Sequence, residues 1–217
     1  MTKLSILLCA HCPNANYDNL LAKAISSIYE QSYKDYKLFI VLDECWSGTL
    51  SKVKDVITPD TEIIIRNKKD GLAKGKNAGL ERIDTEYVAF LDADDEYLPG
   101  KLEKQMNFIE NNNVDFLGTL AALKDVRSGT PKMIQGFSYP GQYETHEQIS
   151  NRIFHENVMT HGSMLIRKKA LDELGGYNDR RGREDWDLWQ RAISAGYKFH
   201  QLQERLYMLT MGTSVER

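Results

Sequence analysis

Tyr-Val-Ala-Phe-Leu-Asp-Ala-Asp-Asp-Glu, residues 87–96, is an apolar run that ends directly on a cluster of carboxylates. An unbroken apolar run of this length is typical of a β-strand that is buried on both faces of a sheet. In open α/β sheets, ligands bind in the crevice outside the carboxyl ends of the strands. The stretch therefore predicts a sheet strand that delivers acidic side chains to a ligand site.

The carboxylates of this cluster are Asp92, Asp94, Asp95 and Glu96. Like charges this close raise one another's pKa and cost stability unless a cation or a hydrogen-bond network offsets them. A hard divalent metal such as Mg²⁺ or Mn²⁺ satisfies that need, because it takes oxygen ligands from carboxylates and from substrate phosphates. The alternative is a solvated acidic turn, or a cap for the helix that Pro99 begins.

A glycine-spaced basic segment lies just upstream, where residues 70–79 read Asp-Gly-Leu-Ala-Lys-Gly-Lys-Asn-Ala-Gly. Backbone amides at the start of a helix, together with Lys74 and Lys76, suit a diphosphate. The order of residues is not that of a Walker A loop. An ordinary exposed helix that carries lysines is the alternative.

Further outward, the first half of the chain alternates apolar runs with amphipathic stretches, which predicts βαβ units and a parallel sheet. The expected strands are 4–8, 38–42, 63–65, 87–91 and 114–117, and the expected helices are 74–83, 99–111 and one around 20–28. The second half is less regular. It has turns at 129–131 and 139–141, a strand at 163–166, and helices at 168–174 and 184–195 that glycines end.

The last of these helices opens on Arg183-Glu184-Asp185-Trp186-Asp187-Leu188-Trp189. Carboxylates in a first turn are favoured by the helix dipole, so capping alone could explain them. The functional interpretation is that one carboxylate is a general base and that an aromatic ring forms a platform for a sugar. Because Trp186 and Trp189 are three residues apart, we expect at least one of them to pack in the core.

Composition excludes several classes of protein. The chain has 217 residues with 28 basic and 31 acidic side chains, a formal charge of -3 and no long run of either sign, which argues against a nucleic-acid partner. The apolar stretch near the start is far too short to span a bilayer, and it is interpreted as a first strand rather than a signal peptide. We therefore expect one cytoplasmic domain.

Three cysteines, Cys9, Cys12 and Cys45, do not make an even disulfide set. The C-x-x-C spacing of Cys9 and Cys12 raises a thioredoxin-like or zinc interpretation, but no second pair follows to complete a four-ligand site. Structural thiols are the expected outcome.

In this order and on this scaffold, the segments resemble the family 2 glycosyltransferases of the GT-A fold. Residues 71–79 match the family's Gly-Leu-x-x-x-Arg-Asn-x-Gly with Lys76 in place of Arg, and residues 91–95 match its metal motif. Glu184-Asp185 matches the start of its catalytic helix, after a Gly-Gly-Tyr turn at 175–177. The chain differs from the family at Cys9-Ala10-His11-Cys12, where a polar segment is usual, and at Cys45-Trp46 after Asp43-Glu44.

The resemblance implies an α/β GT-A (Rossmann-like) domain over 1–217, with a mostly parallel central sheet flanked by helices. Residues 1–98 would be the nucleotide-sugar half and 99–217 the acceptor half. It also implies an inverting transfer from a nucleoside-diphosphate sugar, UDP-linked, to a hydroxyl of a glycan or glycolipid, with Mn²⁺ or Mg²⁺. An acceptor hydroxyl needs a base, and a nucleoside diphosphate leaves poorly until its charge is offset. As in glycoside hydrolysis, the transition state would resemble an oxocarbenium ion.

The residue roles that the resemblance implies are as follows. Asp185, with Glu184 beside it, would be the base, Asp43 would bind the nucleobase, and Asp94 would ligate the metal. The remaining donor-side residues would be Ala10, His11, Lys74, Lys76, Asn77, Asp92 and Ala93. His161 and Trp186 would lie on the acceptor side. The late segment 209–214, where the family often has a basic or histidine residue before a serine, has none before Ser214.

Two alternatives remain open at this point. The first is a noncatalytic module that binds a nucleotide sugar or a glycan, which the retained Glu184-Asp185 disfavours. The second is a sugar nucleotidyltransferase, which would have its glycine-rich signature close to the first strand rather than immediately before the acidic one.

Overall fold

The computed structural model describes residues 2–68, 71–127, 130–139, 143–180 and 182–213. The expected turns at 129–131 and 139–141 lie partly outside the described residues, and Ser214 lies wholly outside them. In the first half the elements are β1 (Leu4–Ala10), α1 (Ala15–Tyr29), β2 (Tyr36–Asp43), α2 (Thr49–Lys54), β3 (Glu62–Arg66), α3 (Leu72–Leu80) and β4 (Tyr87–Asp92). Every strand predicted in this half up to residue 91 is confirmed.

The second half holds more regular structure than the sequence predicts. Its elements are β5 (Glu96–Tyr97), α4 (Lys101–Asn111), β6 (Phe116–Asp125), β7 (Lys132–Tyr139), α5 (His146–Arg152), a 3₁₀ turn η1 (His161–Ser163), β8 (Leu165–Arg167), α6 (Lys168–Glu173), α7 (Glu184–Ser194) and β9 (Phe199–Met211). The strand predicted at 114–117 begins later and continues to Asp125. The strand predicted at 163–166 is the short β8, which follows η1.

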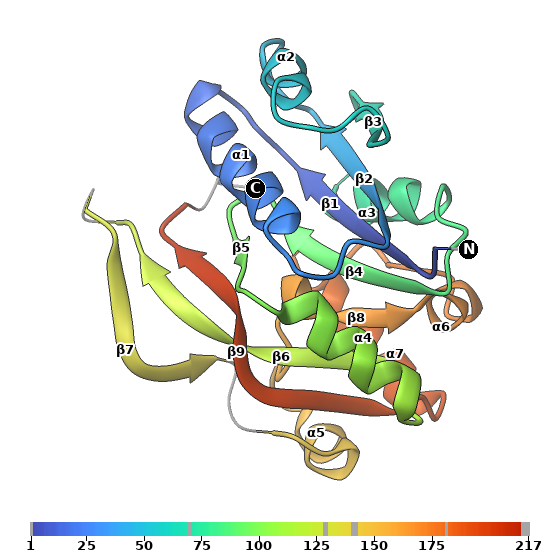
Figure 1. The fold of residues 1–217 in the computed structure, drawn as a ribbon. Helices are drawn as coiled ribbons and strands as arrows, with labels where there is room; N and C mark the ends of the chain where they lie inside the picture. Colours follow the sequence, from blue (N-terminus) through green and yellow to red (C-terminus); the bar gives the residue numbers. More distant parts are fainter. Residues whose placement is uncertain (1, 69–70, 128–129, 140–142, 181, 214–217) are drawn as a thin grey trace.

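The described strands form one nine-stranded sheet in the order β3-β2-β1-β4-β8-β6-β9-β5, with β7 paired to β6 (Figure 1). The strands β3, β2, β1 and β4 are parallel, and so are β6 and β9. The pairs β4–β8, β6–β8, β6–β7 and β5–β9 are antiparallel. The expected mostly parallel sheet is thus a mixed one, because β8, β7 and β5 run antiparallel to the strands they pair with.

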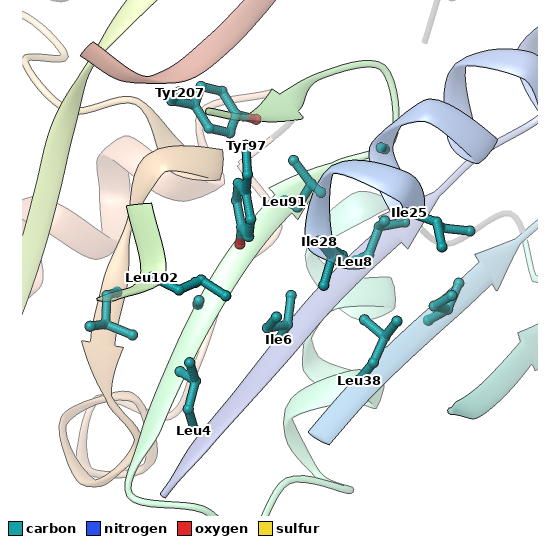
Figure 2. Packing of buried hydrophobic residues seen from close by; sticks show 14 of the residues in the cluster. Leu4, Ile6, Leu8, Ile25, Ile28, Leu38, Leu91, Tyr97, Leu102 and Tyr207 are labelled. Carbon is teal, nitrogen blue, oxygen red and sulfur yellow. The ribbon is translucent and has the colours of Figure 1, made fainter. Parts of the chain in front are cut away.

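Helices cover both faces of the sheet, so its strands have apolar side chains on both sides. On one face, α1 and α4 pack on the even-numbered residues of β1, and Leu4, Ile6 and Leu8 share one cluster with Ile28 of α1 and Leu102 of α4 (Figure 2). On the other face, Leu7 of β1 packs in a second cluster with residues of α3, α5, α6 and α7. The alternation of side chains along a strand divides the core in this way.

The helix α3 lies unusually close to the sheet. A Cβ atom on Gly79 would come within 2.4 Å of Leu7 Cδ1 and 3.1 Å of Val41 Cγ2. Only a residue without a side chain allows this approach, which brings the end of α3 against β1 and β2.

The long strand β9 ties the second half to the acidic end of β4. Its first residues pair with β6, and residues further along pair with both β6 and β5. From this strand, Tyr207 donates a 2.7 Å hydrogen bond to Asp95 Oδ2, and the N–H of Thr210 donates one of 2.7 Å to Asp95 Oδ1. Among the described residues, no helix has the length and apolar character that a membrane crossing requires.

Candidate active site

A cavity of about 530 Å³ lies at the carboxyl ends of β1 and β4. Its walls come from both halves of the chain. The lining residues are Cys9, His11, Cys12, Tyr17, Leu72, Lys76, Asp92, Ala93, Asp94, Arg127, Thr210, Met211, Gly212 and Thr213. Of the predicted donor-side residues, the cavity brings together His11, Lys76, Asp92, Ala93 and Asp94.

The three aspartates after β4 have different environments. Asp95 is 2% exposed, and its pKa is raised well above the usual value, first by burial and then by the charges of Asp94 and Asp92. Asp95 accepts hydrogen bonds from Tyr207 and Thr210, so its role is to hold β9 against the end of β4. Asp92 and Asp94 face the cavity, where Asp94 accepts a hydrogen bond from the Thr213 hydroxyl and Asp92 Oδ1 lies 3.5 Å from His161 Nδ1.

Lys76 reaches the cavity from a buried position on α3. Its Nζ donates a 2.9 Å hydrogen bond to Glu184 Oε1 at the start of α7, and both side chains are 7% exposed. Burial acts to lower the pKa of Lys76, but the charges of Glu184 and Asp92 outweigh it and the net shift is upward. Glu184 thus holds a lysine in the cavity wall and is itself turned away from solvent.

The other predicted residues of α3 lie outside the cavity. Lys74 is exposed and is not among the lining residues. Asn77 connects α3 to the Gly-Gly-Tyr turn, because its Nδ2 donates to Tyr177 O and its Oδ1 accepts from Tyr177 N, both at 2.8 Å. Gly176 has a φ of 70°, and a Cβ there would come within 2.5 Å of Asn77 Oδ1.

The end of β2 lies behind the cavity wall and contacts one of the lining residues. Asp43 is 9% exposed and forms an ion pair with Arg66, at 3.0 Å between Oδ2 and Nη1. The backbone carbonyl of Asp43 lies 3.0 Å from Nδ1 of His11, which lines the cavity. Ala10 is buried, and its carbonyl accepts a hydrogen bond from the Cys45 thiol at 3.4 Å. Asp43 and Ala10 are therefore one layer removed from the cavity.

The helix α7 presents Asp185 near its first turn. Asp185 Oδ2 accepts a 3.0 Å hydrogen bond from Asn157 Nδ2, and Oδ1 accepts one of 2.7 Å from the Trp186 N–H. Trp189 is fully buried against Phe116 and Phe199, as expected for one of the two tryptophans. Trp186 is half-buried, and its indole N–H donates to Ile153 O.

His161 lies between the cavity residue Asp92 and the core. Its Nε2 is 2.9 Å from the Tyr177 hydroxyl, and its ring is 4.8 Å from that of Phe90. The side chain is 8% exposed and does not line the cavity. It can therefore orient Asp92, while direct contact with a ligand needs a rearrangement of the wall.

Sequence reasoning missed several lining residues, above all Arg127. Arg127 follows β6 and makes hydrogen bonds through Nε and Nη2 to both carboxylate oxygens of Asp125. The end of β9 lies against it, since a Cβ on Gly212 would come within 2.3 Å of Arg127 Cγ. Residues 125–127 resemble an ordinary polar hairpin, so no local signal distinguishes this arginine.

The carboxylates suit a divalent metal only together with a substrate. The described residues contain no cluster of three or more His, Cys, Asp or Glu side chains that could hold an ion. Asp92 and Asp94 do front the same cavity as Lys76 and Arg127. Two carboxylates completed by phosphate oxygens and water are a usual set for Mg²⁺ or Mn²⁺, so the residues fit such an ion.

The fold of the chain is the GT-A fold. Within this fold class, the chain belongs to glycosyl transferase family 2, whose family model matches residues 9–175. The chain is 32% identical over 194 residues to an uncharacterized glycosyltransferase of Methanocaldococcus jannaschii, covering 87% of this chain and 65% of that protein. It is 30% identical over 218 residues to the GalNAc(5)-diNAcBac-PP-undecaprenol beta-1,3-glucosyltransferase of Campylobacter jejuni, covering 99% of this chain and 67% of that protein.

Solved structures agree on the fold. Staphylococcus aureus TarS in complex with UDP-GlcNAc matches with a TM-score of 0.75 at 17% identity, over 98% of this chain and 60% of that one. The mannosyltransferase PcManGT of Pyrobaculum calidifontis, in complex with GDP-Man and Mn²⁺, matches with a TM-score of 0.74 at 15% identity, over 97% and 57%. The chain thus spans about three fifths of these solved chains and about two thirds of the curated relatives.

Proposed function

We propose that this chain carries out the inverting, metal-dependent transfer of a sugar from a nucleoside-diphosphate sugar, UDP-linked, to a hydroxyl of a glycan or glycolipid. The observation that carries the proposal is the cavity in which Asp92 and Asp94 face Lys76 and Arg127. Carboxylates and cations around one space of about 530 Å³ suit a diphosphate and its counter-ion.

In this proposal the basic residues bind the leaving diphosphate. Lys76 enters from α3 and Arg127 from the end of β6, so the two cations approach the cavity from different walls. A Mn²⁺ or Mg²⁺ ion held through Asp94, with Asp92 beside it, would offset the negative charge of the diphosphate. Glu184 positions Lys76 through its hydrogen bond to Nζ. The hydroxyl of Thr213 donates a hydrogen bond to Asp94, and a bound metal ion would replace that contact.

We assign the base to Asp185. The amide of Asn157 and the N–H of Trp186 each bind one of its carboxylate oxygens, so the side chain is held in one orientation. It would take the proton of the acceptor hydroxyl while that oxygen attacks the anomeric carbon and the diphosphate leaves from the opposite side. Attack opposite the leaving group inverts the configuration at that carbon.

The nucleobase would lie beside β1 and β2, near His11 and Tyr17, with Asp43 behind them. TarS, solved with UDP-GlcNAc, supports a UDP-linked donor, and PcManGT, solved with GDP-Man and Mn²⁺, supports the metal. The acceptor would enter along the second half, residues 99–217, past Trp186 and His161. The undecaprenol-linked saccharide in the name of the Campylobacter relative supports a glycolipid acceptor.

Calorimetric titration of UDP, GDP, dTDP and CDP tests the proposal, first with Mn²⁺ and then with a chelator. We expect UDP to bind more tightly than the other three, and the chelator to weaken its binding. Tighter binding of GDP would contradict the UDP assignment and leave the transferase class in place. Absence of binding by every nucleotide would favour a noncatalytic module, and UDP binding without sugar transfer to any of a broad acceptor panel would do the same.

A further inference from the structure

The proposed reaction makes no use of the three thiols. Cys9 and Cys12 line the cavity, and Cys45 lies beside Cys12. Cys12 lies in the loop after β1, and Cys45 lies in the loop after β2. The N–H of Cys12 donates a 3.3 Å hydrogen bond to Cys45 Sγ. The two loops are further joined by a 2.8 Å hydrogen bond from Trp46 N to Cys12 O.

The surroundings of this pair give its members different access to solvent. Cys12 is 1% exposed, in the cavity wall, whereas Cys45 is only half-buried. Cys9, three residues before Cys12, has its thiol pKa raised to about 12 by burial. The pairing that the C-x-x-C spacing suggested is therefore not the one that the fold favours.

We propose that Cys12 and Cys45 form a reversible disulfide, so that the wall of the cavity contains a redox-modified site. A disulfide needs two Cβ atoms within about 3.5–4.5 Å of each other. Cys45 Sγ already lies 3.3 Å from the backbone nitrogen of Cys12, and a backbone hydrogen bond joins the two loops, so side-chain rotation can bring the two sulfurs together.

The chemistry follows thiol–disulfide exchange with an oxidised low-molecular-weight thiol, RSSR. The Cys45 thiolate attacks one sulfur of RSSR, which forms a Cys45–S–S–R mixed disulfide and releases RS⁻. The Cys12 thiol then gives up its proton to solvent, and its sulfur attacks Cys45 Sγ and displaces the second RS⁻. Two protein thiols are oxidised and one RSSR is reduced to two RSH, so atoms and electrons balance.

The electrostatics of the pair suit this order of events. The pKa of Cys45 is lowered, first because the Cys12 thiol donates a hydrogen bond to its sulfur, and the Cys12 N–H acts in the same direction. The same contact and burial raise the pKa of Cys12. The more exposed member therefore carries the larger thiolate fraction and is the attacking group.

Thiol mapping of the full chain tests the proposal. The protein is equilibrated in glutathione buffers of stepped redox ratio, alkylated with N-ethylmaleimide, and mapped by peptide mass spectrometry. We expect a Cys12–Cys45 cross-linked peptide with Cys9 still alkylated, and complete return of all three alkylated cysteines after dithiothreitol. The Cys9→Ser variant should cross-link as the parent does. Cys12→Ser and Cys45→Ser should each lose the cross-link, and Cys45→Ser should also lose the mixed disulfide with glutathione.

Any of three results would overturn the proposal: a Cys9–Cys12 link, a mixed disulfide on Cys45 that never resolves, or three alkylatable thiols in every buffer. Because Cys12 is buried, Cys12→Ser can fail to fold for reasons of packing alone. The side chain of Cys45 is partly exposed, so Cys45→Ser is then the informative variant. Binding of UDP to the reduced protein is measured separately. Its absence would count against the proposed function and would leave the thiol map unchanged.

Discussion

At the scale of single residues, the ion pair of Lys76 with Glu184 joins two parts of the chain that are 108 residues apart. The motif at 71–79 identifies Lys76 in the sequence, but no local pattern shows that its charge is removed from water almost completely. Burial acts to raise the pKa of Glu184, but Lys76 outweighs burial, and the net shift is downward. Since the pKa of Lys76 is raised, the pair contributes stability from above about pH 4.3 to below about pH 10.4, the unfolded values of the two groups.

Replacing one member of this pair should destabilise the protein strongly. Lys76→Met leaves Glu184 buried without its cation, and we expect a loss of about 3–5 kcal/mol in the free energy of unfolding at pH 7. The double variant Lys76→Met with Glu184→Leu should recover most of that loss, because neither charge remains buried. Urea titrations check both values. Nucleotide affinity should stay low in the double variant, and its return to the parent value would remove Lys76 from the donor site.

Asp185→Asn should abolish sugar transfer while nucleotide affinity stays unchanged. The amide is nearly the same size as the carboxylate, but it cannot take up a proton from the acceptor hydroxyl. Steady-state kinetics should show a loss of kcat of about 10²–10⁴-fold, and calorimetry should show the parent affinity for UDP. Asp187→Asn, a nearby carboxylate held by Arg180 and Arg191, is the matched control. Near-normal turnover by Asp185→Asn would refute the assignment.

Arg127→Ala should weaken UDP binding about threefold to tenfold at low salt, and less at high salt, as expected for an exposed phosphate contact. Lys74→Ala removes an exposed cation that does not line the cavity, so it should leave the affinity unchanged. Calorimetry at two ionic strengths measures both. An equal loss of UDP affinity in the two variants would mean that the affinity depends on the net charge of the protein and not on a contact made by Arg127.

At the scale of elements, the first half of the fold is readable from the sequence and much of the second half is not. The strands β1, β2 and β4 are covered on both faces, so they appear as unbroken apolar runs. By contrast, β9 reads Phe-His-Gln-Leu-Gln-Glu-Arg-Leu-Tyr-Met-Leu-Thr-Met, in which a polar first half precedes a short apolar run at 206–209 and no clean alternation extends along the strand. Its register shifts against β6, so no single period describes it.

The same distinction applies to the site. Asp92, Ala93, Asp94 and Lys76 could be predicted because they stand in contiguous motifs on predictable elements. Arg127 and the contact of Cys12 with Cys45 depend on which loops meet, and that follows from the strand order, which a local pattern does not contain. The environment of Asp95 could not be foreseen either, because its partners Tyr207 and Thr210 are on β9.

The close approach of α3 to the sheet gives a prediction at this scale. In Gly79→Ala the new methyl group meets Leu7 and Val41, and we expect a net loss of about 1–3 kcal/mol in the free energy of unfolding. Alanine's better helix propensity, about 1 kcal/mol, would give the opposite sign if the packing could relax. Chemical denaturation distinguishes the two. Lys74→Ala, on the exposed face of the same helix, adds no packing contact and changes helix propensity little, so it should leave stability nearly unchanged.

At the scale of the whole molecule, one buried lysine should make the free energy of unfolding depend on pH. Lys101 is fully buried, with its Nζ bonded to Gln105 Oε1 at 2.7 Å and 4.0 Å from the centre of the Tyr97 ring. Burial holds the pKa of Lys101 well below its usual value. Between that lowered pKa and about 10.4, the unfolded chain binds a proton that the folded chain does not, so stability rises with pH and is lost as pH falls.

Lys101→Met should remove this contribution. We expect the free energy of unfolding of the parent to rise with pH, above the lowered pKa of Lys101 and below about 10.4, more steeply than that of the variant, by up to about 1.4 kcal/mol per pH unit. Urea titrations at stepped pH measure the two slopes. Identical slopes would mean that Lys101 keeps its proton in the folded state.

The position of β9 between β6 and β5 also bears on how the chain acquires its structure. Both neighbours precede it by more than 70 residues, so their pairings have a high contact order, and such pairings form slowly. Until β9 inserts, Asp95 lacks two hydrogen-bond donors and the cavity lacks the wall formed by residues 210–213. A partly folded chain could thus contain the parallel half of the sheet and still be unable to retain a ligand. Ligand binding would then select for completed molecules, and a ligand present during refolding would stabilise only the last species to form.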